Sequence, residues 1–144
     1  MRVIEAYEPA ESIAVLPLPT DKKEKEMVVC LSDLHVGLGA ENFWNYYDNN
    51  ILYARLTEYI YKIKQVVNEH NIRKGHFILG GDLISSNIHL TLRIENRENV
   101  IKQIMTVATA LSEFFNILSP VFSEINIYSV RGNHSRITPN KKEH

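Results

Sequence analysis

Short apolar runs alternate along the chain with two long stretches of helical spacing. The runs MVVCLS (27–32), HFIL (76–79) and INIYSV (125–130) are rich in β-branched and aromatic residues, which is typical of strands. We expect the first run to be covered on both faces, because it is apolar without alternation. Between the runs, apolar residues recur every three or four positions over residues 50–71 and 95–118. That period indicates two amphipathic helices.

The order strand, helix, strand, helix, strand predicts an α/β domain with a mostly parallel sheet and right-handed crossovers. A chain of 144 residues suits one such domain. Residues 1–26 hold three prolines and a run of mixed charge, so we interpret them as an N-terminal arm. We expect Ile13–Leu18 to lie along a sheet edge, where proline is tolerated. Residues 27–144 would then form the domain.

Polar residues able to bind a metal ion follow each predicted strand. They are Asp33 and His35 after the first strand, Asp82 after the second, and Asn133 and His134 after the third. Because ligands of parallel sheets collect beyond the carboxyl ends of the strands, we expect these residues to converge. Carboxylate, imidazole and amide groups together suit Mn²⁺, Fe²⁺, Zn²⁺ or Mg²⁺. A carboxylate such as Asp82 can also bridge two ions about 3.5–4 Å apart, an arrangement used in phosphoryl displacement.

Each motif taken alone has a plainer interpretation. Residues 80–82 also fit a turn capped by the aspartate, and residues 132–134 also fit a turn with Asn133 in a left-handed conformation. An Asp-x-His sequence is weak as a ligand signature on its own. The occurrence of all three motifs after successive predicted strands favours a metal site.

Three motifs carry a family resemblance. LSDLHVG (31–37), LGGDLIS (79–85) and VRGNHS (130–135) resemble, in order, the first three motifs of the calcineurin-like metallophosphoesterases. The resemblance covers roughly residues 27–135. It implies part of an αββα sandwich with a βαβαβ core, here only the N-terminal portion of the family's domain.

The resemblance also implies a role for each candidate residue. Asp33 and His35 would bind the first metal, Asp82 would bridge both metals, and Asn133 would bind the second. His134 would act near the leaving group as general acid or transition-state stabiliser. The nucleophile would be a metal-bridging hydroxide, with Mn²⁺ the expected metal and Fe, Zn or Mg as alternatives.

The first motif is more similar to the phosphodiesterase and DNA-repair nuclease branch than to the protein serine/threonine phosphatases. The phosphatases carry an aspartate and an arginine shortly after the bridging aspartate, where this chain reads LISSN, and a glutamate where it has Ser135. We therefore expect a phosphodiester substrate, with nucleic acid as the preferred class.

Several further side chains are candidates for substrate contact. Arg131 and Arg136 flank the Asn-His pair and could bind phosphate bidentately. His89 follows the second motif and either faces the cleft or is a solvated loop residue. The aromatic residues of ENFWNYYDNN (41–50) could stack nucleobases, but packing of the helix against the sheet is the favoured interpretation.

The chain departs from complete members of the family, which supply three more histidines, one alone and two in a Gly-His-x-His motif. No such motif occurs in this sequence. Three explanations remain: an N-terminal fragment of a longer enzyme, a fold completed by self-association or a second polypeptide, or a non-catalytic binding or scaffold domain. We favour the fragment, and we expect this chain alone to be weakly active or inactive.

Composition adds constraints on class and compartment. The net charge of -1 gives no global basic field for capture of nucleic acid. The single cysteine, Cys30, lies in an apolar run and is predicted to be a buried, inert thiol. No apolar stretch approaches the roughly 20 residues of a membrane helix, so we expect no membrane contact and a cytoplasmic location.

Overall fold

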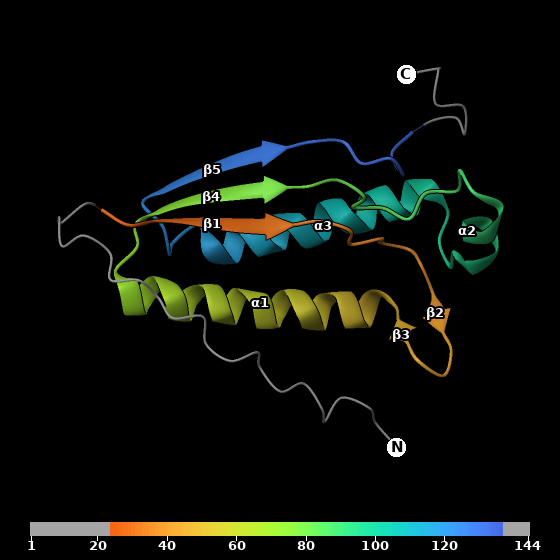
Figure 1. Cartoon of the computed structure of the whole chain (residues 1–144), viewed down its shortest axis with the longest axis horizontal. Helices are drawn as coiled ribbons and strands as arrows, with labels where there is room; N and C mark the ends of the chain where they lie inside the picture. Colours follow the sequence, from red (N-terminus) through yellow and green to blue (C-terminus); the bar gives the residue numbers. More distant parts are fainter. Residues whose placement is uncertain (1–23, 137–144) are drawn as a thin grey trace, which may run out of the picture.

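The structure, a computed structural model, describes residues 24–136 of the chain. A parallel three-stranded sheet in the order β1-β4-β5 forms its centre, with helices α1 and α3 as the crossovers (Figure 1). The elements are β1 (Glu26–Leu31), β2 (Ala40–Glu41), β3 (Tyr46–Tyr47), α1 (Asn49–His70), β4 (Lys74–Leu79), α2 (Leu90–Glu95), α3 (Val100–Leu118) and β5 (Glu124–Ser129). The α/β class is confirmed. The predicted arm, including Ile13–Leu18, lies outside the described residues except for its last three positions.

Both long helices lie on the same side of the sheet. The strand order advances in one direction, so two crossovers of the same hand place both helices against one face. In Figure 1, α1 lies below the strands and α3 lies behind them, and the two helices are in contact. None of the helices within residues 24–136 is long and apolar enough to cross a membrane.

The other face of the sheet is open in the part of the chain that the structure describes. In β1, Val29 and Leu31 are buried against the helices, whereas Val28 is 62% exposed and Cys30 is exposed. The predictions of a first strand covered on both faces and of a buried thiol at Cys30 are therefore wrong for residues 24–136. The reason is that alternate side chains of a strand point to opposite faces, and both helices cover the same one.

Aromatic packing fastens α3 to the middle strand. Phe77 of β4 is fully buried and meets Phe114, Phe115 and Phe122 edge to face, with ring centroids 6.2, 5.2 and 5.6 Å apart. Burying an aromatic side chain of this kind stabilises a fold by about 1.5–3 kcal/mol. These contacts place α3, and hence its first turn, in a fixed position relative to the ends of β1 and β4.

Asparagine and aspartate side chains set the starts of the helices. Asp48 accepts the Ile51 N–H at 2.9 Å before α1, a hydrogen bond that is the first cause of its lowered pKa. Asn99 accepts the Lys102 N–H at 2.9 Å before α3. The helix predicted over residues 95–118 begins only at Val100, because Asn96 is extended and Asn99 caps the start of α3, and the short α2 before it was not predicted.

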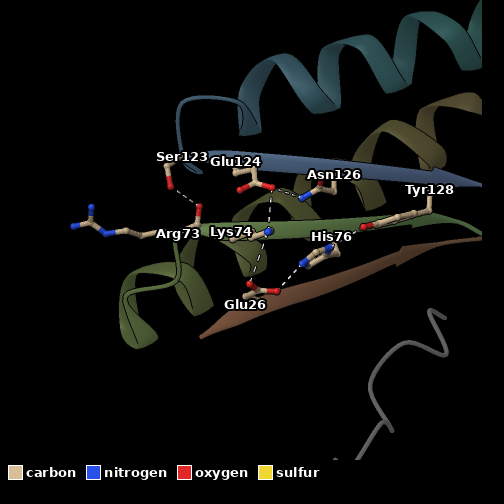
Figure 2. Close-up of polar contacts among 8 residues, drawn as sticks. All are labelled: Glu26, Arg73, Lys74, His76, Ser123, Glu124, Asn126 and Tyr128. Carbon is tan, nitrogen blue, oxygen red and sulfur yellow. Dashed lines mark hydrogen bonds and ion pairs between the residues drawn. The ribbon is translucent and has the colours of Figure 1, made fainter. Parts of the chain in front are cut away.

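Charged and polar residues occupy the amino-terminal rows of the open face (Figure 2). Lys74 in the middle strand reaches Glu124 at 3.1 Å and Glu26 at 3.9 Å, and its pKa is raised, first by the hydrogen bond to Glu124. His76 lies between Glu26 at 2.7 Å and the Tyr128 hydroxyl at 3.2 Å. This ladder joins the three strands at one end and leaves the opposite end for the loops described next.

Candidate metal centre

The loops after β1 and β4 run side by side at the carboxyl edge of the sheet. Leu31 and Leu79 occupy the same row of the ladder, so the two loops begin at neighbouring points. The Asp33 N–H donates to the Gly81 carbonyl at 3.1 Å, and the His35 N–H donates to the Asp82 carbonyl at 3.1 Å. Two more backbone hydrogen bonds follow: the Val36 N–H donates to the Leu83 carbonyl at 3.0 Å, and the Ser85 N–H donates to the Val36 carbonyl at 3.0 Å. The structure thus brings the first and second motifs together, as the parallel topology predicts.

Left-handed backbone is concentrated in these loops. Within residues 24–136, five non-glycine residues have positive φ, and three of them are Asp33 (56°), His35 (45°) and Asp82 (48°). A fourth, Ser86 (62°), lies in the same loop as Asp82, and only Asn71, which ends α1, is elsewhere. Such conformations cost about 1–3 kcal/mol each and cluster at ligand-binding and catalytic sites.

The third motif lies against the second at backbone distance. A Cβ built on Gly132 would stand 2.0 Å from Asp82 Oδ1 and 2.1 Å from the Asp82 nitrogen, so only glycine fits there. The His134 N–H donates to Asp82 Oδ1 at 2.8 Å. The Asp82 carboxylate is therefore oriented by the backbone of the loop that carries Asn133 and His134.

Three histidine rings lie near one another at these loops. The ring centroids of His35 and His134 are 4.8 Å apart, edge to face, and that of His89 is 6.0 Å from His134. His134 Nδ1 is 2.8 Å from the Ser85 carbonyl oxygen. Because a carbonyl only accepts, Nδ1 carries the proton, and the lone pair of the neutral ring is on Nε2.

The side chains of Asp33 and His35 are slightly further apart than two ligands of one ion. Asp33 Oδ1 lies 3.8 Å from His35 Nε2. Two ligand atoms, each about 2.1 Å from one ion at tetrahedral to trigonal angles, stand about 3.4–3.6 Å apart. In addition, the buried Nδ1 of His35 has no hydrogen-bond partner among the described residues. A buried polar atom without a partner is costly, and an ion or a second-shell acceptor would remove that cost.

The predicted ligands do not all converge. Within residues 24–136, no three acidic, histidine or cysteine side chains stand close enough together to form a ready-made metal site. Asn133 is exposed, and its backbone carbonyl oxygen accepts the Nε–H of Arg136 at 2.7 Å. That contact ties Arg136 to its own loop, whereas Arg131 is exposed.

The aromatic loop behaves differently at its tip and at its base. Tyr47 is buried, and its hydroxyl donates to the Leu34 carbonyl, so the packing interpretation is confirmed there. Phe43 and Trp44 are 84% and 85% exposed, so packing is wrong for them. They stand at the tip of the β2–β3 hairpin, in a turn closed by the Asn42 side chain, beyond the reach of the core.

Two buried residues of the site were missed in the sequence analysis, Ser85 and Gln103. Both are fully enclosed, and both hydrogen-bond to the loops that carry the candidate ligands. For Gln103 the sequence does hold a signal, since it is a polar residue on the stripe of α3 that is otherwise made by Ala110, Phe114 and Leu118. Ser85 gives no comparable signal, because its backbone carbonyl makes the contact.

Comparisons with protein-family models, with curated proteins and with solved structures gave no match for this chain. The functional interpretation therefore depends on the residues of the site itself.

Proposed function

We propose that this chain carries the metal-binding part of a phosphodiester hydrolase, with nucleic acid as the preferred substrate class. The observation that supports the proposal most strongly is the left-handed backbone of Asp33, His35 and Asp82 at adjoining strand ends. The resemblance to calcineurin-like metallophosphoesterases and the αββα sandwich that it implies belong to the same proposal.

In this proposal Asp33, His35 and Asp82 hold a divalent cation, with Asn133 as a further ligand. Carboxylate oxygens and imidazole nitrogen suit Mn²⁺ best within the expected set, and Fe, Zn or Mg are alternatives. A bound divalent cation supplies Lewis-acid activation of phosphate and water. Two observations support the assignment. His35 Nδ1 is buried without a hydrogen-bond partner among the described residues, and His35 Nε2 lies 3.8 Å from Asp33 Oδ1.

The protein's own groups orient the reaction. The Ser85 carbonyl accepts His134 Nδ1–H at 2.8 Å, so Nε2 is the nitrogen that would take up a proton from water and then donate it to the leaving oxygen. His89, whose ring lies 6.0 Å from that of His134, is a candidate contact for the substrate. Arg131 is exposed at the same loop and is a candidate for phosphate binding.

The test is Mn²⁺ binding by calorimetry together with hydrolysis of bis-p-nitrophenyl phosphate and of a single-stranded oligonucleotide. Asp82→Asn keeps an oxygen for the His134 N–H but removes the charge. We expect it to weaken Mn²⁺ binding about 100-fold or more, because even outer-shell partners of metal ligands are worth about 10–100-fold. Any turnover by the parent chain should disappear in this variant.

Asp48→Asn is the matched control, because Asp48 caps α1 outside the ligand loops and asparagine preserves the cap. Equal Mn²⁺ affinity in the parent chain and in Asp82→Asn would contradict the metal site. Mn²⁺ binding without hydrolysis of either substrate would fit both the fragment and the binding or scaffold domain, whereas turnover by the parent chain would exclude the binding or scaffold domain.

A further inference from the structure

Gln103 is a polar residue in the buried stripe of α3. Its side chain is fully enclosed, at the first turns of the helix, where Figure 1 shows α3 reaching the loops beyond the sheet. Burying an amide is unfavourable unless its hydrogen bonds are made. The hydrogen-bond partners of this amide therefore indicate its structural role.

The amide of Gln103 contacts both ligand-bearing loops. Its Oε1 accepts the Ser86 N–H at 2.8 Å, in the loop after Asp82, and its Nε2 donates to the Glu98 carbonyl at 2.9 Å. The same side chain fills the space beside Gly37 in the loop after His35, where an added Cβ would stand 2.4 Å from Gln103 Cγ. One side chain thus lies against both loops, which are also joined by hydrogen bonds between their backbones.

The peptide group between Ser85 and Ser86 links Gln103 to His134. The N–H of that peptide belongs to Ser86 and donates to Gln103, whereas its C=O belongs to Ser85 and accepts His134 Nδ1–H at 2.8 Å. A trans peptide is planar, with its N–H and C=O pointing in opposite directions. The orientation that Gln103 imposes on the N–H is therefore transmitted to the carbonyl and to the histidine ring.

The conformation at this peptide needs such support. Ser86 has a φ of 62°, a left-handed conformation that is unfavourable for a serine. Its N–H is held by Gln103, and its carbonyl accepts the Asn96 side-chain amide. Two side-chain amides, one from α3 and one from the segment before it, thus satisfy both backbone groups of the strained residue.

We infer that Gln103 is a positioning residue for His134: it holds the Ser85–Ser86 peptide so that the ring keeps its proton on Nδ1 and its lone pair on Nε2. A catalytic role for the Nε2 lone pair rests on the proposed function. The relay of hydrogen bonds from Gln103 through the Ser85–Ser86 peptide to His134 does not, so the relay and the catalytic role can be tested separately.

The decisive measurement is the ¹⁵N spectrum of the histidine rings in the metal-free chain at a pH where the rings are neutral. We expect His134 in the Nδ1–H tautomer in the parent chain. Gln103→Met keeps the length and the burial but cannot accept the Ser86 N–H. It should move His134 toward the tautomer mixture of a free imidazole. The resonance is assigned from its loss in His134→Gln.

Leu118→Ala is the control for general destabilisation, because Leu118 is fully buried at the far end of the same helix. It should leave the His134 tautomer as in the parent chain. An unchanged tautomer in Gln103→Met, or an equal change in Leu118→Ala, would overturn the inference.

Amide hydrogen exchange in the parent chain keeps the inference testable if Gln103→Met does not fold. The Ser86 N–H should be protected, and in a folded Gln103→Met its protection should fall about tenfold, as expected for one lost hydrogen bond. Fast exchange of Ser86 in the parent would reject the relay. Absence of Mn²⁺ binding with an intact relay would reject the proposed function alone.

Discussion

Gly132 lies so close to the backbone of Asp82 that no side chain fits between them. We predict that Gly132→Ala weakens Mn²⁺ binding at least about tenfold, because its Cβ would stand 2.0 Å from the Asp82 carboxylate and force the loops apart. Overpacking of this kind also costs about 1–3 kcal/mol of stability. Calorimetry of Mn²⁺ binding and thermal unfolding measure the two effects.

Gly39→Ala is the matched control at the residue scale. Its Cβ would stand 2.1 Å from Nε of Arg97, but that atom belongs to a flexible, largely exposed side chain that can move away. Metal affinity should stay at the parent value. If Gly132→Ala also bound Mn²⁺ like the parent chain, the contact between the second and third motifs would have no role in the site.

Single residues differ in how far the sequence predicts their part in the site. Asp33, His35 and Asp82 come from loops whose meeting follows from parallel topology, so their proximity is predictable. The contact between the Ser85–Ser86 peptide and His134 cannot be predicted from the sequence, because every residue has a backbone carbonyl. Arg136 also escapes prediction, since its contact with the Asn133 carbonyl depends on a local turn.

Neighbouring residues of β4 face opposite sides of the sheet, so replacing each with alanine should lower the free energy of unfolding by different amounts. We predict that Phe77→Ala lowers the free energy of unfolding by about 3–5 kcal/mol, because it empties the aromatic contact with α3. Ile78→Ala, one residue on and 37% exposed, should cost about 1 kcal/mol or less. Urea unfolding of the two variants measures both values.

This pair tests the layer structure as a whole. Two alanine variants of equal cost would mean that the open face is covered in solution, contrary to the arrangement of residues 24–136. A small effect of Phe77→Ala would mean that α3 does not hold the sheet as described, and the position of Gln103 beside the loops would lose its basis.

The elements were largely predictable from periodicity, and the exceptions have physical causes. The five main helices and strands were all expected, most within one or two residues of their observed ends. The short helix α2 and the late start of α3 were not expected, because residues 95–99 are all polar and their pattern does not show that Asn96 and Asn99 bind backbone groups. The one-sided burial of β1 was also missed, since an apolar strand does not reveal which of its faces is covered.

At the scale of the whole molecule, the open face has two distinct halves. The amino-terminal rows carry the ladder of Glu26, Lys74 and Glu124, which water solvates readily. The row nearer the candidate metal centre aligns Cys30, Ile78 and Tyr128, all exposed. Exposed apolar surface of this kind marks a place where contact with another surface is favourable.

The single cysteine of the chain reports on that face directly, because Cys30 is exposed at the β1 end of the apolar row. We predict that its thiol reacts with a disulfide reagent in the native chain at a rate comparable with that in urea. Protection of Cys30 would show that the face is covered in solution. Protection that is lost on dilution, in parallel with a falling sedimentation coefficient, would identify a second copy of the chain as the cover. Protection independent of concentration would instead place the cover within the same chain, because an intramolecular contact does not respond to dilution.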